Sequence, residues 1–300
     1  MGRSFITFIQ ISLLAILCSP AWASDTAVAL VVESKTKQAL SFHSQLQQLR
    51  SDLTIELYSS DALPDAKTLK TIPTILAMGP KALAVVLGRS DNRSRILGLF
   101  VRENAKSKLQ KLYPKKRFTI LDNSPTLDRQ LALIKILNPQ AKQVAVFHST
   151  QYPAIPDALL KMGKALGLTI QTTELKDPLN WDRGALKSLK DADLVLGLDD
   201  SAIYNATTIR SILMRLYRAS RPLVGPDKGY VRAGAVASTF SGVKETLRAI
   251  SELLSSKAEW PSVIHNPYFN VSINTQVARS LNITVGNPEE LKAKVQEYLP

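Results

Sequence analysis

Short apolar runs alternate along this chain with segments whose apolar residues recur at helical spacing. The runs typical of strands cover residues 27–32, 53–57, 73–78, 95–101 and 118–121, and then residues 143–147, 168–172, 194–198 and 222–224. Strands that alternate with helices favour parallel pairing. Two such series in succession predict an α/β protein of two similar lobes, each a mainly parallel sheet flanked by helices, joined by a hinge with a cleft between them.

The two series are separated by an amphipathic helical segment that ends at Asn138-Pro139. We therefore place the boundary between the lobes near residue 142. This division gives an N-terminal lobe, a C-terminal lobe and a final strand–helix segment that completes the lobes, over residues 24–142, 143–265 and 266–300.

The first residues predict the compartment. Arg3 precedes an apolar core, and Ala21 and Ala23 supply the small residues that a signal peptidase reads, so residues 1–23 are predicted to be a signal peptide cleaved near Ala23. The core is short for a membrane span, although a retained anchor remains an alternative. Cleavage removes Cys18, the only cysteine, and excludes disulfides and thiolate chemistry from the exported chain. We expect a periplasmic or otherwise exported protein.

The chain is basic, with 38 Lys and Arg against 25 Asp and Glu, a formal net charge of +13. Such a charge is compatible with nucleic acid, acidic lipid or anionic solutes, or simply with a solvated surface. Nucleic-acid binding is disfavoured, because export removes the partner and the basic stretch between residues 106 and 117 contains a single aromatic residue, Tyr113, which is too few for a stacking surface.

Motifs of the common enzyme classes do not occur in the sequence: G-x-S-x-G, the P-loop, G-x-G-x-x-G and H-E-x-x-H are all missing. The three histidines lie far apart in sequence, at His43, His148 and His265. A Ser149–His148–Asp199 triple at strand ends is explained by chance in a chain of this length. Asp199-Asp200 is compatible with an acid–base pair, a helix cap or a contact to a ligand amine. We expect no enzymatic activity, no cofactor and no metal.

Three segments carry a resemblance to a known family. Residues 221–254 read as strand, polar loop, strand and helix, and contain GYVRAGAVAS. Residues 131–150 read LALIKILNPQAKQVAVFHST, and residues 268–295 read YFNVSINTQVARSLNITVGNPEELKAKV. These segments resemble the corresponding runs of the solute-binding components of ABC transporters that have the type I periplasmic-binding-protein fold.

The resemblance implies an exported protein that captures a small polar organic molecule, amino-acid-like or anionic, in an interlobe cleft for delivery to an ABC permease at the inner membrane. Two departures stand against it: Pro80 replaces a threonine of the family, and no Asp-Pro pair follows the strand at 95–101. They leave open a sensor or partner-regulating module of the same fold that does not feed a transporter. The partner would then be a membrane sensor protein.

Ligands of α/β sheets bind at the carboxyl ends of the strands. By this position, the first lobe would contribute Glu33, Ser34, Gly79, Lys81 and Arg102 to ligand binding, and the second lobe Ser149, Tyr152, Asp199, Ser201, Asp227 and Lys228. Cations in the cleft together with Asp199 suit a zwitterion such as an amino acid.

Overall fold

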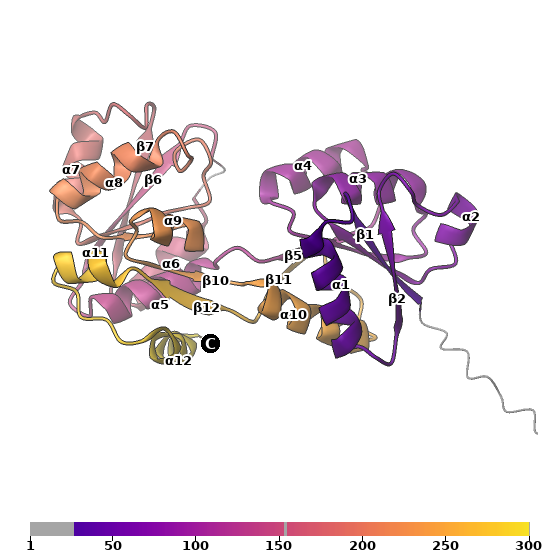
Figure 1. Cartoon of the computed structure of the whole chain (residues 1–300). Coiled ribbons are helices and arrows are strands. Elements are labelled where there is room, and N and C mark those ends of the chain that lie inside the picture. Colours follow the sequence, from indigo (N-terminus) through magenta and orange to yellow (C-terminus); the bar gives the residue numbers. More distant parts are fainter. Residues whose placement is uncertain (1–26, 153–154, 300) are drawn as a thin grey trace, which may run out of the picture.

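The structure is a computed structural model that describes residues 27–152 and 155–299, and its strands form two six-stranded sheets. The first sheet is parallel throughout and contains, in spatial order, β11 (Val263–His265), β5 (Thr119–Asp122), β4 (Arg95–Leu99), β3 (Thr74–Met78), β1 (Ala27–Val32) and β2 (Thr54–Ser59). Figure 1 shows each sheet and its helices as a separate lobe. The two-lobe α/β architecture expected from the sequence is confirmed.

The second sheet is parallel except for one edge strand. Its order is β12 (Asn270–Ile273), β10 (Ala237–Phe240), β9 (Leu223–Val224), β8 (Leu194–Leu196), β6 (Gln143–Ser149) and β7 (Thr169–Leu175). The edge strand β12 pairs antiparallel with β10.

Both faces of the first sheet are covered. One face carries α1 (Lys37–Leu49) and α10 (Val243–Ser255), and the other α2 (Ala66–Leu69), α3 (Pro80–Arg89) and α4 (Glu103–Leu112). In β1, Val28, Leu30 and Val32 pack toward α1, while Ala29 and Val31 pack toward α3. A strand buried on both faces has no polar position, which explains the continuous apolar run.

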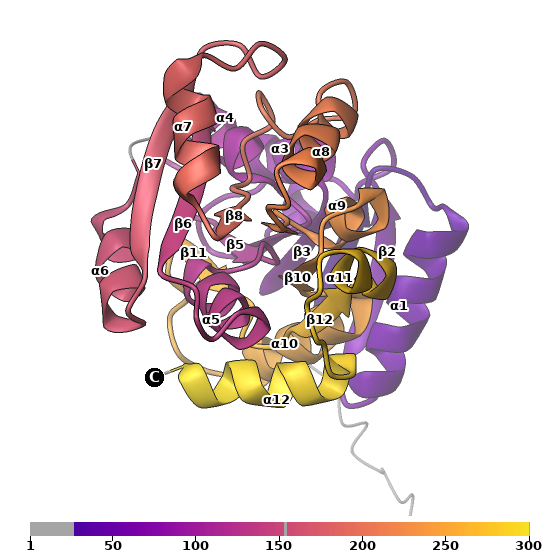
Figure 2. The same cartoon turned by 90° about the vertical axis from the view of Figure 1, so that its left-hand side faces the viewer.

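The second sheet is covered in the same way. One face packs against α5 (Leu127–Leu137), α6 (Asp157–Ala165), α11 (Thr275–Ser280) and α12 (Pro288–Tyr298), and the other against α7 (Arg183–Asp191), α8 (Ile209–Arg218) and α9 (Lys228–Ala233). Helix α12 lies against α5 and β12 at the base of this lobe (Figure 2).

The chain crosses between the lobes after β5, after β10 and after β11. Helix α5 therefore lies in the core of the second lobe, although the expected boundary near residue 142 assigns it to the first. Helix α10 and β11 lie in the first lobe, within the expected C-terminal lobe of 143–265. The reason for both differences is that an amphipathic pattern reveals a buried face but not the sheet that buries it.

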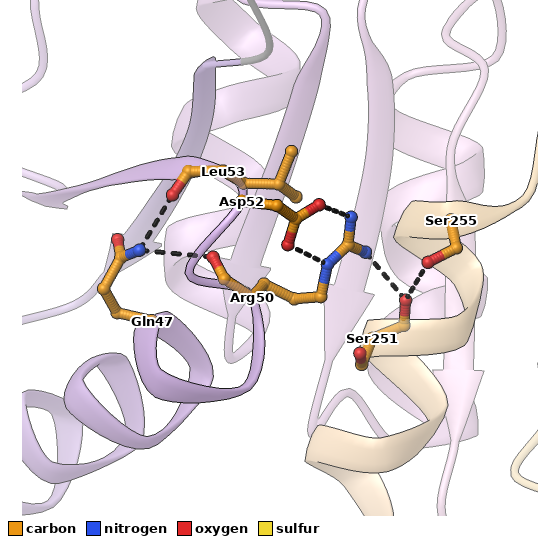
Figure 3. Close-up of polar contacts among 6 residues, drawn as sticks. All are labelled: Gln47, Arg50, Asp52, Leu53, Ser251 and Ser255. Atoms are coloured by element: carbon orange, nitrogen blue, oxygen red, sulfur yellow. Dashed lines mark hydrogen bonds and ion pairs between the residues drawn. The ribbon is translucent and has the colours of Figure 1, made fainter. Parts of the chain in front are cut away.

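A polar cluster attaches α10 to the first lobe (Figure 3). The Arg50 guanidinium makes a two-pronged contact with Asp52, with Nε at 2.8 Å and Nη2 at 2.7 Å from the carboxylate oxygens, and its Nη1 donates to the carbonyl oxygen of Ser251 at 2.9 Å. The hydroxyl of Ser255 donates to the same carbonyl at 3.1 Å, and the amide of Gln47 braces the loop by donating to the Arg50 carbonyl at 3.3 Å. Arg50 is thus the link between the end of α1 and a helix distant in sequence.

The segment at 221–254 follows its expected order, with one addition. The polar loop between β9 and β10 contains the short helix α9, which Asp227 caps by accepting from the backbone N–H of Gly229 at 2.6 Å. Residues 201–208 form turns, in which the Asn205 side chain accepts from the N–H of Thr208 at 3.1 Å, and helix α8 begins at Ile209.

None of the helices within residues 27–152 and 155–299 has the length and apolar character needed to cross a membrane. The predicted signal peptide at 1–23 lies outside the described residues.

Candidate functional site: the interlobe cleft

A cavity of about 300 Å³ lies between the lobes, at the carboxyl ends of the strands. It is lined from the first lobe and the crossing after β5 by Phe100, Val101, Arg102, Leu121, Asp122, Asn123, Ser124 and Pro125, and from the second by Asp199, Pro226, Asp227, Lys228, Phe240 and Ser241. Its volume is at the lower end of the range for small-molecule sites, which favours a ligand of few heavy atoms.

Arg102 is the charged group that reaches across the cavity. It stands between β4 and α4, and its Nη1 lies 3.7 Å from Oδ1 of Asp199 while its Nη2 lies 3.9 Å from Oδ2 of Asp227. The Arg102 side chain is 63% exposed, so these long ion pairs contribute little to stability. A ligand carboxylate that docks on the guanidinium at shorter distance would replace them at small cost.

Asp199 and its neighbour Asp200 have different environments. Asp200 is buried and accepts from the backbone N–H of Ser149 at 2.6 Å, from the Ser149 hydroxyl at 3.2 Å and from the N–H of Ala202 at 3.1 Å. It therefore fastens the ends of two strands and is not available as one of an acid–base pair. Asp199 lines the cavity, where burial raises its pKa despite the opposing effect of Arg102.

Asp227 is positioned by a buried amide. The Gln130 side chain donates to the carbonyl oxygen of Gly225 at 2.6 Å and accepts from the backbone N–H of Thr239 at 3.0 Å. Gln130 is only 2% exposed, and the bonds lock the end of β9 to β10. The turn that follows Gly225 then presents Asp227 to Arg102.

Two aromatic rings supply apolar surface to the cavity. Phe240 lies beneath the ammonium group of Lys228, whose Nζ is 4.5 Å from the ring centre. Phe100 is 41% exposed and has a φ of 56°, a backbone conformation that costs energy for an aromatic residue. Its ring and that of Phe42 form a T-shaped pair at a centroid distance of 5.9 Å. The strain places an exposed ring at the wall of the cleft.

The crossing segments bring polar groups to the floor of the cleft. Asp122 ends β5 and pairs with His265, which ends β11, with Nδ1 and Oδ2 3.1 Å apart. Just beyond, the buried Asn266 donates from its side-chain amide to Oδ1 of Asn123 at 2.8 Å. The first and third crossings are therefore tied together side by side.

The structure brings together some of the residues expected to bind ligand. Arg102, Asp199, Asp227 and Lys228 line the cavity. The others lie outside its lining: Glu33, Ser34, Gly79, Lys81, Ser149, Tyr152 and Ser201.

Several of these outlying residues have other roles. The carboxylate of Glu33 and Nζ of Lys81 form an exposed pair at 2.6 Å. The N–H of Gly79 donates to the carbonyl of Leu99 at 2.8 Å, and its φ of 91° suits glycine. Ser149 is buried against Asp200, whereas Tyr152 is half-buried, and burial raises its pKa.

Sequence reasoning did not select Phe100, Phe240, Asp122 or Asn123. The rule that ligands bind at the carboxyl ends of strands could have predicted Phe100 and Asp122, because each stands at the end of an apolar run. The same holds for Phe240, which ends β10, a strand that the sequence also predicts. The His265 partner of Asp122 carried no such signal, because β11 has only three residues and its pairing with β5 is not visible in the sequence.

Among residues 27–152 and 155–299, no group of three or more His, Cys, Asp or Glu side chains is arranged to hold a metal ion.

Comparison by sequence gives no match to a protein-family model and none to a curated protein. Comparison by structure does. A ligand-free, open substrate-binding protein with adhesive properties from Clostridium difficile superposes with a TM-score of 0.61 at 12% identity, over 87% of this chain and 96% of that one.

Two further solved structures lie at a TM-score of 0.50. One is an ABC domain in complex with L-Trp from Streptococcus pneumonia, 15% identical over 89% of this chain and 98% of that one. The other is a conserved domain protein from Vibrio cholerae, 17% identical over 90% and 98% of the respective chains. The chain thus shares the two-lobe fold of solved substrate-binding proteins, which confirms, at the level of the fold, the resemblance inferred from its motifs.

Proposed function

We propose that this chain is an exported solute-binding protein. It captures a small polar organic molecule, amino-acid-like or anionic, in the interlobe cleft and delivers it to an ABC permease at the inner membrane. The proposal includes no catalytic step. One observation carries it: Arg102 from the first lobe faces Asp199 and Asp227 of the second across the cavity, at 3.7 Å and 3.9 Å.

Ligand capture would proceed by exchange of these ion pairs. A ligand carboxylate takes the Arg102 guanidinium, which frees Asp199 and Asp227 to bind a ligand ammonium group. The Phe100 and Phe240 rings are positioned to contact its apolar part. A molecule held from both lobes stabilises the closed arrangement over the open one, because closure adds contacts that the open state lacks.

Thermal unfolding against a panel of amino acids and small organic anions tests the proposal. A ligand at about 1,000 times its Kd adds roughly 4 kcal/mol to the free energy of unfolding. In a chain of this size the Tm rises by about 10 °C. Titration calorimetry then measures the Kd of the selected ligand for Arg102→Met and Asp199→Asn, with Lys81→Met as the matched control outside the cavity lining.

We expect both cleft variants to lose affinity by at least tenfold and the control to bind as wild type. A panel without any shift, on protein known to be folded, would reject the solute-binding proposal. Delivery is tested separately: deletion of the gene should abolish uptake of the same ligand. Unchanged uptake with intact binding would favour a sensing role for this fold.

A further inference from the structure

A second cavity, of about 550 Å³, lies in the first lobe at the amino ends of β4, β5 and β11. The interlobe cleft adjoins the carboxyl ends of β4 and β5, so the two sites occupy opposite edges of one sheet. Every lining segment of the second cavity comes from the first lobe, at residues 92–96, 110–119 and 259–262. Its shape therefore does not depend on closure of the cleft. We call it the amino-edge pocket.

The amino-edge pocket is strongly basic. Its lining contains Arg93, Arg95, Lys116 and Arg117 against the single carboxylate of Glu259. The two outer arginines are only loosely paired: Nε of Arg93 lies 3.7 Å from Asp91 and Nη1 of Arg117 lies 3.9 Å from Glu259. Both side chains are more than four-fifths exposed, at 83% and 84%, so a stronger anion exchanges for these partners readily.

An aromatic wall stands beside these charges. The guanidinium of Arg95 lies over the Trp260 ring at 4.3 Å from its centroid, and Phe118 and Tyr113 complete the apolar lining. Arg95 itself is held by the carbonyl of Ser256, to which Nη1 donates at 3.0 Å. Arg95 therefore covers one face of the indole ring and fixes the ring in place, and a flat ligand group would pack against the part of this Arg95–Trp260 stack that lines the pocket.

The loops of the pocket are cross-linked. The side-chain amide of Asn92 donates to the carbonyl of Lys115 at 3.0 Å, and its oxygen accepts from the backbone N–H of Arg117 at 3.2 Å. The Thr119 hydroxyl donates to the carbonyl of Pro261 at 2.7 Å. These bonds join all three lining segments, so the backbone that carries the arginines is already ordered, and the entropy lost on binding is mainly that of the exposed arginine side chains.

We propose that the amino-edge pocket is a second ligand site, which takes an organic anion whose negative group is attached to a flat ring. Arg93 and Arg117 bind the anionic group, and Trp260 receives the ring. Exposed charges alone attract any anion weakly, and an aromatic wall alone attracts any apolar group. Their juxtaposition selects a molecule that has both.

Titration calorimetry with four probes tests this assignment: adenosine monophosphate, adenosine, inorganic phosphate and phthalate. We expect at least one of the two ring-bearing anions to bind about tenfold or more tightly than both adenosine and inorganic phosphate. Preference for the nucleotide identifies a phosphate ligand, and preference for phthalate a carboxylate. Arg117→Gln and Trp260→Leu should each weaken that binding by about fivefold or more.

Glu259→Gln tests the site by a gain of affinity, which a merely structural role of the pocket residues would not produce. Removing the one carboxylate of the lining should strengthen anion binding by about two- to threefold, because it removes repulsion and frees Arg117. Arg102→Met alters the interlobe cleft and should leave the affinity of the four probes unchanged. Such a result would show that the probes bind at the amino-edge pocket and not in the cleft. Weak or equal binding of all probes, or binding insensitive to Arg117→Gln in a folded protein, overturns the proposal.

Discussion

Nδ1 of His265 lies 3.1 Å from Oδ2 of Asp122, at the point where two neighbouring strands leave the first lobe. The hydrogen bond to Asp122 raises the pKa of His265 against the opposing effect of burial. Burial raises the pKa of Asp122, but its hydrogen bonds to His265 and Ser124 outweigh this and leave that pKa lowered. Arg129 and Asp128 also act on the histidine, in opposite directions. The stability of this contact between two crossing segments should therefore depend on pH.

The first prediction follows from the signs of these shifts. A raised His265 pKa gives stability that is fully present below the ordinary value of 6.5 and is lost as the pH rises through the folded-state pKa. A lowered Asp122 pKa gives stability that is present above 3.8 and is lost as the pH falls through its folded-state pKa. The difference in Tm between wild type and His265→Gln should therefore be largest between those two values and vanish at alkaline pH. A difference independent of pH would contradict this coupling.

The second prediction concerns Asp199 and an amine-bearing ligand. Burial raises the Asp199 pKa above its ordinary 3.8, and only the ionised carboxylate binds an ammonium group. Affinity should consequently fall as the pH drops through that raised value, by up to tenfold per pH unit below it, since the proton and the ligand compete. Calorimetry across mildly acidic pH measures the effect. In Asp199→Asn the affinity should be weak and nearly independent of pH over this range; a wild-type slope that persists would exclude Asp199.

Phe100 allows binding and stability to be separated. Its φ of 56° costs roughly 1 kcal/mol, which glycine or asparagine avoids. We therefore expect Phe100→Gly and Phe100→Asn to change the free energy of unfolding by no more than about 1 kcal/mol. Ligand affinity should fall by about two- to tenfold in both, because the exposed ring is lost from the cleft. A large loss of stability with unchanged affinity would show that the ring serves packing instead.

The sequence predicts the architecture well because parallel sheets bury both faces of their central strands. A continuous apolar run such as that of β1 indicates a buried strand, and the alternation of such runs with helices indicates parallel pairing. The boundary between the lobes is harder to predict from the sequence. Helix α5 shows an apolar face, but no local feature shows that this face packs on the second sheet, and the three-residue β11 is too short to register.

The candidate site, too, is only partly predictable from the sequence. Arg102 and Asp199 follow apolar runs, and the rule for carboxyl strand ends finds them. The same rule also selects Glu33, directly after β1, and Lys81, in the first turn of α3 after β3, yet these two residues pair with each other outside the cavity lining. Strand ends share an edge of the sheet, but only the relative position of the lobes decides which of them face the cleft.

The last prediction concerns the attachment of α10 through Arg50. The Arg50 side chain is only 10% exposed and joins Asp52 to the Ser251 carbonyl, so Arg50→Ala leaves that carbonyl without its charged donor. Loss of these charge-assisted bonds should lower the free energy of unfolding by about 1.5–3 kcal/mol, and the Tm by about 5 °C. Arg50→Lys should recover only part of this, because an ammonium group cannot contact both carboxylate oxygens and Ser251 in the same planar arrangement.

Ser255→Ala is the matched control, since its exposed hydroxyl donates to the same carbonyl, and it should cost less than about 0.5 kcal/mol. Equal losses in the alanine variants of Arg50 and Ser255 would show that the carbonyl, and not the guanidinium bridge, governs how firmly α10 is held.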